Sequence, residues 1–173
     1  MSTADGPHRT TLKLDGPPPR ILLIQAPYYA GIVGGMADGV RRVVAEAGGA
    51  LDVVDVAGAF ELPAALRLAL SQPYDGYVLL GCVVRGETDH YDHICREACA
   101  GTMAITAETG AAVGFGLLTV HDIAQAEARS RDDAHNKGAE AAQAALMQVA
   151  LRRRWSVAAR HPSEVPALRG ITA

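Results

Sequence analysis

A short polar turn holds the residues best suited to chemistry in this chain of 173 residues. The turn runs from Arg85 to Thr88, and His90 follows it in or just before the first turn of a predicted helix. Free backbone N–H groups at the start of a helix receive anions, and a histidine gains and loses protons close to neutral pH. The local sequence alone favours an ordinary helix start, with an anion site beside a proton carrier as the second interpretation.

The residues before and after this turn predict a strand and a helix. Residues 77–84 are apolar apart from a glycine and a tyrosine hydroxyl, which is typical of a strand buried on both faces of a parallel sheet. From Tyr91 the period becomes helical, with Ile94, Ala98 and Ile105 on one face. Ligands of open α/β sheets bind outside the carboxyl ends of the strands, so the turn lies where a site is expected.

The same alternation of strand and helix continues along the chain. Further strands are predicted at Ile21–Ala26, Leu51–Ala57 and Val113–Leu118, and helices at about 32–47, 62–71, 91–108, 119–128 and 136–154. Alternation implies right-handed βαβ crossovers and a parallel sheet covered by helices on both faces. We therefore predict an α/β fold, a three-layer α/β/α sandwich of flavodoxin-like type with a four-stranded parallel sheet.

Some predictions concern single elements and their ends. Asp52 and Asp55 make the second strand an edge strand rather than a central one. Thr119 is the predicted cap of the fourth helix, with Asp122 three residues later. The run Arg152–Arg154 is predicted to end the last helix, where positive charge suits the helix dipole.

The sequence divides into one domain with two flanking segments. Residues 21–154 form the predicted domain, since a chain of this length fits a single core. Residues 1–20 are expected to be a flexible arm, in which Thr11–Leu14 is a candidate extra strand against a neighbouring subunit. Residues 155–173 are expected to be a loosely structured C-terminal tail.

Composition and charge exclude several classes of partner. A formal net charge of −3 gives no reason to expect nucleic acid or an anionic membrane. The longest apolar runs are shorter than a membrane span requires, and the first ten residues lack the apolar core of a secretory signal. Cys82, Cys95 and Cys99 are expected to be reduced core thiols of a cytoplasmic protein rather than a metal or redox site.

Five segments together resemble the lumazine synthase family of riboflavin biosynthesis, in that family's order and spacing. They are GAFELP at 58–63, GCVVRGETDHYD at 81–92, GFGLLT at 114–119, QAEAR at 125–129 and NKGAEAA at 136–142. The resemblance spans residues 20–153 or so, and its most specific part is GAFE-x-P with RGETxH. It implies condensation of 5-amino-6-(D-ribitylamino)uracil with 3,4-dihydroxy-2-butanone 4-phosphate to 6,7-dimethyl-8-ribityllumazine, with release of phosphate and water and without a metal or organic cofactor.

The resemblance also implies roles for single residues around the polar turn. His90 is the expected proton carrier. Gly86, Glu87 and Thr88 are expected to hold the substrate phosphate through backbone N–H groups and the threonine hydroxyl, with the Glu87 side chain directed away. Arg129 is the expected second phosphate ligand, because a planar guanidinium suits paired contacts with phosphate oxygens. Without the resemblance it would be read as a solvated residue at a helix end.

A second group of residues is expected to bind the pyrimidine and its ribityl chain: Tyr28, Tyr29, Ala59, Phe60, Glu61, Val83, Val84, Phe115 and Lys137. Tyr28 would stack on the pyrimidine, a position where the family usually has Phe or Trp. Pro27 and Tyr29 also depart from the family, which often has Arg at the position of Pro27 and commonly has Asn or His at the position of Tyr29. Taken alone, both tyrosines would be read as part of a surface turn.

The family forms pentamers, paired pentamers and hollow shells of sixty subunits, and Arg129 and Phe115 match residues that reach a neighbouring subunit's site. We therefore expect a homo-oligomer built from pentamers with sites between subunits, and riboflavin synthase is a candidate partner. Two other hypotheses are a non-catalytic flavin- or lumazine-binding relative, such as a storage or shell protein, and a flavodoxin-like carrier of FMN. The presence of both His90 and Arg129 favours the enzyme.

Overall fold

A computed structural model of the chain describes residues 12 and 14–160. Its sheet has four parallel strands in the order β2-β1-β3-β4. The strands are β1 (Arg20–Gln25), β2 (Ala50–Asp55), β3 (Gly76–Val84) and β4 (Val113–Val120). The helices are η1 (Pro27–Tyr29), α1 (Ala30–Glu46), η2 (Ala59–Glu61), α2 (Leu62–Ala69), α3 (His90–Thr109), α4 (Ile123–Ser130) and α5 (Lys137–Arg160).

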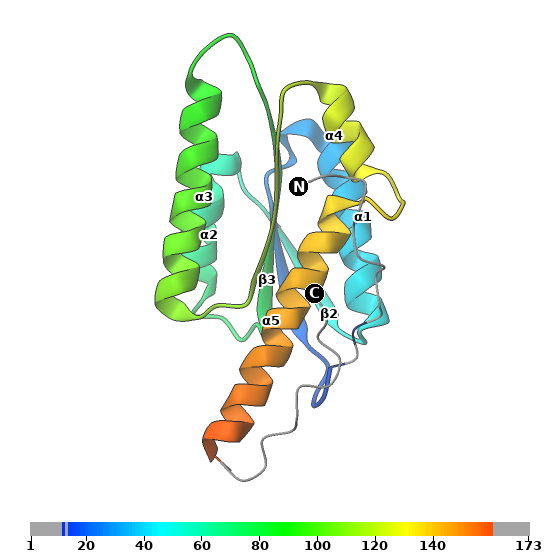
Figure 1. The fold of residues 1–173 in the computed structure, drawn as a ribbon, viewed down its shortest axis with the longest axis vertical. Coiled ribbons are helices and arrows are strands. Elements are labelled where there is room, and N and C mark those ends of the chain that lie inside the picture. Colours follow the sequence, from blue (N-terminus) through cyan, green and yellow to red (C-terminus); the bar gives the residue numbers. More distant parts are fainter. Residues whose placement is uncertain (1–11, 13, 161–173) are drawn as a thin grey trace.

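Helices cover both faces of the sheet, with α2 and α3 on one side and α1, α4 and α5 on the other (Figure 1). The predicted α/β fold is therefore confirmed, as a three-layer arrangement of flavodoxin-like type. Among the helices of the described residues, none is long and apolar enough to span a membrane.

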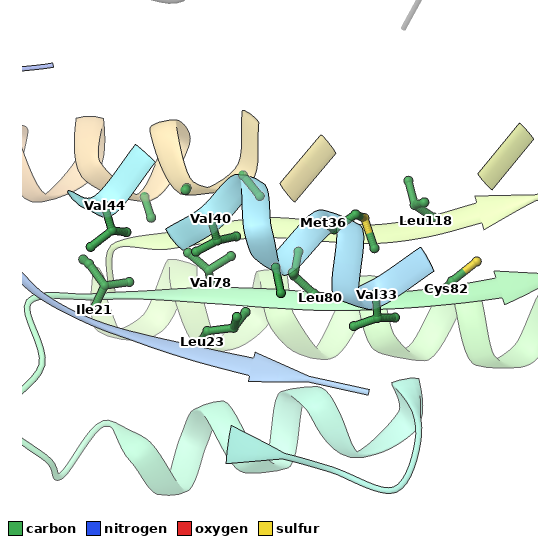
Figure 2. Close-up of a cluster of buried hydrophobic side chains, with 14 of the residues drawn as sticks. Ile21, Leu23, Val33, Met36, Val40, Val44, Val78, Leu80, Cys82 and Leu118 are labelled. Carbon is green, nitrogen blue, oxygen red and sulfur yellow. The ribbon is translucent and has the colours of Figure 1, made fainter. Parts of the chain in front are cut away.

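The strand β3 lies at the centre of this sheet and is apolar on both faces. Val78 and Leu80 belong to the hydrophobic cluster under α1 and α5, which Figure 2 shows. Tyr77 and Leu79 belong to the cluster under α2 and α3. Burying a large apolar side chain contributes about 1.5–3 kcal/mol to stability. A shift of one residue would move each side chain of β3 into the opposite cluster, so the register of β3 with β1 and β4 is strongly specified.

The strand β2 lies at the edge of the sheet, as Asp52 and Asp55 predict. Its residues are mostly exposed, and Val53 and Val54 are each 42% accessible. The two aspartates make polar contacts with neighbouring segments. Asp52 accepts hydrogen bonds from Arg20 and Tyr74, and Asp55 accepts one from the Gln25 side chain.

The capping prediction for the fourth helix is wrong. Thr119 lies in β4, where it pairs with Val83, because strand pairing continues as far as Val120. Asp122 is itself the N-cap of α4, and its Oδ1 accepts a hydrogen bond from the Gln125 backbone N–H at 2.9 Å. A short carboxylate side chain is well suited to that position.

The last helix does not end at Arg152–Arg154, since α5 continues through Trp155 to Arg160. The Arg153 guanidinium donates to the carbonyl oxygens of Asp15 and Pro17, and it also lies 3.4 Å from a carboxylate oxygen of Asp75. Arg152 also donates to the Asp75 carbonyl, so Arg152 and Arg153 bind segments beside the helix instead of stabilising its end. Thr11 and Lys13, half of the predicted arm strand, lie outside the described residues, and the domain boundaries stay predictions.

Helix α1 meets the end of α4 and the start of α5 at positions that have no side chain. A Cβ added to Gly35 would overlap the carbonyl oxygen of Ser130, and one added to Gly138 would overlap that of Met36. A Cβ added to Gly34, the neighbour of Gly35 on the same helix, would meet no described atom within 4 Å. Position 35 of α1 therefore has no space for a side chain, whereas the adjacent position 34 does.

Gly35→Ala is expected to lower the free energy of unfolding by about 1–3 kcal/mol, because the new methyl group must displace a backbone carbonyl. Gly34→Ala is the matched control, and it is expected to raise stability by up to about 1 kcal/mol through helix propensity and a less flexible unfolded chain. Urea unfolding at equal protein concentration measures both variants. Equal shifts in the two would contradict the close helix contact.

Candidate functional site

Three loops leave the carboxyl edge of the sheet side by side. They are η1 after β1, η2 shortly after β2, and residues 85–89 after β3. Because β1 lies between β2 and β3, its last residues bond to both neighbours: the Val56 N–H donates to the Gln25 carbonyl at 2.8 Å, and the Ala26 N–H donates to the Leu80 carbonyl at 2.9 Å. The structure thus brings together most of the residues that the sequence analysis selected.

The loop after β1 presents an aromatic ring to solvent. Tyr28 is 79% accessible, whereas Tyr29 is half-buried against the α1 cluster. The two rings meet edge to face, with their centroids 5.0 Å apart. The edge contact orients Tyr28 while its ring remains accessible, which suits stacking against a flat ligand.

The loop after β2 has one buried and two exposed residues. Ala59 is buried in the α2 cluster, whereas Phe60 is 57% accessible and Glu61 is exposed. Oε2 of Glu61 lies 3.2 Å from where a Cβ on Gly58 would stand, so its carboxylate folds back over that glycine. The loop therefore offers an exposed carboxylate beside an exposed aromatic ring.

The loop after β3 leads into the first turn of α3. Gly86, Glu87, Thr88 and His90 are exposed, and a Cβ added to Gly86 would meet no described atom within 4 Å. Asp89 is the N-cap of α3, but its side chain makes no capping hydrogen bond. A helix start of this kind has backbone donors and a positive dipole end available to an anion, and His90 is the first residue of that helix.

The valines at the end of β3 are directed to opposite faces of the sheet. Val83 packs with the α2 cluster and Val84 with the α1 cluster, and both are half-buried. Successive side chains of a strand alternate between faces, so a ligand on one face would contact only one of them directly. Val83 and Val84 can therefore both line one pocket only if the ligand extends across the end of β3.

Arg85, which the sequence analysis did not select, joins the two ends of the polar turn. Its backbone N–H donates to the Val120 carbonyl at 2.9 Å. Its guanidinium donates to Oδ1 of Asp92 at 2.5 Å and lies 4.6 Å from the centre of the Tyr91 ring. Arg85 thus ties β3, β4 and the first turn of α3 together around residues 86–89.

The remaining predicted residues lie on β4, α4 and α5. Phe115 is on the edge strand β4, 37% accessible, and five residues before the strand's carboxyl end, which is about 16 Å along a strand. Arg129 is half-buried in the last turn of α4, where its Nη1 donates to the Gln125 carbonyl at 2.8 Å. Lys137 begins α5 and pairs with Glu140 at 2.7 Å. Within one chain, Phe115 is therefore too far along its strand to reach the carboxyl-edge loops.

The three cysteines are free and differ in exposure. Cys82 is buried, Cys95 half-buried and Cys99 exposed, so the prediction that all three lie in the core is wrong for Cys99. Burial raises the pKa of Cys82 to about 11, and partial desolvation raises the pKa values of Cys95 and of the more accessible Cys99, which keeps these thiols protonated at neutral pH. The described residues contain no group of three His, Cys, Asp or Glu side chains arranged to hold a metal ion.

Comparison with known proteins gives consistent results. The model of the family described as 6,7-dimethyl-8-ribityllumazine synthase matches residues 18–153. The 6,7-dimethyl-8-ribityllumazine synthase of Novosphingobium aromaticivorans is 43% identical over 138 residues, which cover 79% of this chain and 99% of that protein. The proteins of the same name from Bartonella henselae and Paramagnetospirillum magneticum are 41% and 42% identical, over 78% of this chain and over 89% and 95% of their own lengths.

Arg85→Met is expected to loosen the polar turn, because an ion pair and a cation–π contact at a half-exposed site are worth about 1 kcal/mol together. Such a loss corresponds to roughly fivefold faster opening, so amide hydrogen exchange should accelerate by that factor at His93, whose N–H donates to the Asp89 carbonyl at the start of α3. Arg41→Met, which removes an exposed pair with Asp38, is the control and should leave this segment unchanged. Unchanged exchange in both variants would show that Arg85 does not hold the turn.

Proposed function

The chain belongs to the 6,7-dimethyl-8-ribityllumazine synthase family, and we propose that its reaction takes place at the carboxyl edge of the sheet, between neighbouring copies of the chain. It is an enzyme that forms 6,7-dimethyl-8-ribityllumazine in riboflavin biosynthesis. The observation that carries the location is the uncapped start of α3, where an exposed His90 stands beside the exposed loop 86–88.

The two substrates are 5-amino-6-(D-ribitylamino)uracil and 3,4-dihydroxy-2-butanone 4-phosphate. The phosphate binds the backbone N–H groups of residues 86–88 and the Thr88 hydroxyl, where the dipole of a 20-residue helix favours an anion. The pyrimidine stacks on Tyr28, whose ring is accessible, and the Glu61 carboxylate accepts hydrogen bonds from ribityl hydroxyls. Both substrates are thereby held at adjacent loops, which supplies the orientation that a condensation requires.

The chemistry needs proton transfers rather than a redox step. The 5-amino group attacks the ketone, and loss of water gives an imine. Removal of a proton from the neighbouring carbon then expels phosphate and leaves an enol, which tautomerises to a carbonyl. The ribityl-bearing nitrogen attacks this carbonyl to close the ring with loss of a second water. His90, at the start of α3, is placed to take and return these protons beside the phosphate loop.

The site is completed by a neighbouring subunit, which contributes Phe115 and Arg129. Support comes from Phe115, which is partly exposed and far along β4 from the loops of its own chain.

Large apolar side chains are also exposed on α2 and α3, with Leu68 78% and Met103 67% accessible. Exposed apolar side chains of this kind suit an interface between copies, and the assembly is a homo-oligomer built from pentamers. Riboflavin synthase as a partner and a cytoplasmic location stay predictions.

The activity is tested by mixing the assembled protein with both substrates and following lumazine absorbance against a protein-free blank. Arg129→Ala is expected to raise KM for the butanone phosphate by about 10- to 100-fold, since a charge-assisted contact is worth about 1.5–3 kcal/mol. His90→Gln is expected to lower kcat by about 100-fold or more through loss of proton transfer. Arg41→Ala is the control. A rate equal to the blank in the assembled wild-type protein would instead indicate a binding or shell protein.

The shared site is tested by complementation. His90→Gln and Arg129→Ala proteins, unfolded together and reassembled, should regain up to about one quarter of the wild-type activity, because one interface in four then combines two intact halves. Each variant reassembled alone should stay at its own low rate. Light scattering should give a mass that is a multiple of five chains, and a mass of one 18.1 kDa chain with full activity would contradict the proposal.

A further inference from the structure

One polar side chain is completely buried at the junction of α1, α4 and α5. Asn136 is 0% accessible, and its Oδ1 accepts a hydrogen bond from the Ala139 backbone N–H at 2.9 Å, which caps α5. Its Nδ2 donates to the carbonyl oxygens of Gly35 at 2.9 Å, Ser130 at 3.2 Å and Arg131 at 2.9 Å. The two N–H bonds of one amide are thus shared among three carbonyls from two segments of the chain.

The helices leave room for this amide by lacking side chains around it. A Cβ on Gly39 would overlap Oδ1 of Asn136, and one on Gly35 would overlap the Ser130 carbonyl. Gly138, two residues after Asn136, packs directly on the backbone of α1 at Met36. Three glycines from two helices therefore make room at the same helix junction. Capping of α5 alone would not require such close packing against α1.

Asn136 and its hydrogen-bond partners are sequence neighbours of two residues that we propose to bind the substrates. Ser130 and Arg131 directly follow Arg129, and Asn136 itself directly precedes Lys137. The Arg129 guanidinium is bonded to a carbonyl of its own helix, so its position follows that of α4. Because α4 has only eight residues, its orientation depends on tertiary contacts rather than on its own stability.

We infer that Asn136 is a positioning residue for substrate binding, which fixes the end of α4 and the start of α5 on α1 so that Arg129 and Lys137 are held in one arrangement. This inference rests on the proposed function, in which Arg129 binds the substrate phosphate. The amide is suited to the task because it accepts one hydrogen bond and donates to several acceptors at once. A serine would keep the cap of α5 but would not reach the three carbonyls together.

Asn136→Ser is therefore the central variant, because it keeps the capping acceptor and removes the tie to α1 and α4. It is expected to raise KM for the butanone phosphate at least tenfold, with kcat within about threefold of the wild type. Leu146→Ala is the matched control, since Leu146 is 1% accessible on the same helix and lies away from the junction. It should destabilise the protein without a comparable change in KM.

A double-mutant cycle separates positioning from a merely structural role. In an Arg129→Ala background, Asn136→Ser should raise KM by less than twofold, because the group that it positions is already absent. Additive effects, or a KM no higher than in Leu146→Ala, would overturn the inference. If Arg129→Ala alone leaves this KM unchanged, the proposed phosphate site is wrong and the inference falls with it.

A second variant alters the same junction from the α1 side, and it tests the inference if Asn136→Ser does not assemble. Gly35→Ala displaces the Ser130 carbonyl without altering Asn136, and it should raise KM for the butanone phosphate at least threefold in the folded protein. Gly34→Ala, one residue earlier, should leave KM unchanged. Equal KM values for the two alanine variants would overturn the inference.

Discussion

The burial of β3 on both faces is the constraint on which the rest of the structure depends. This strand fills the cluster under α1 and α5 with one set of side chains and the cluster under α2 and α3 with the other. A shift of one residue would exchange the two sets, so the register with β1 and β4 is fixed along the whole strand. The polar turn that follows is consequently presented at a defined point of the sheet edge.

The two layers of helices are held to this sheet in different ways. The α2–α3 layer packs mainly through apolar side chains, such as Leu62, Leu66 and Ala98. The α1–α4–α5 layer adds a polar tie through Asn136 and close backbone contacts at glycines. An apolar contact tolerates small sliding movements, whereas a buried amide with directed partners specifies one geometry. That difference suits a layer whose helix ends carry Arg129 and Lys137, the charged residues that we propose to bind the substrates.

The site follows from topology more than from any single motif. Parallel strands joined by crossovers place η1, η2 and the β3 loop at one edge, and β1 between β2 and β3 makes them neighbours. Phe115, on the edge strand β4, lies away from this group along its own strand. One chain thus contains every proposed residue without bringing all of them together, which is the physical reason why we propose a site between subunits.

The sequence by itself determined the alternation of strands and helices, the buried character of β3, the edge position of β2 and the family, because periodicity and local motifs report backbone geometry and the burial of a face. It did not predict that Asp122 rather than Thr119 caps α4, or that α5 continues beyond Arg154. It also did not predict the contacts of Arg85 with Asp92 or of Asn136 with Gly35. Those features were decided by the tertiary structure, since strand pairing, ion pairs and buried hydrogen bonds join residues whose proximity only packing establishes.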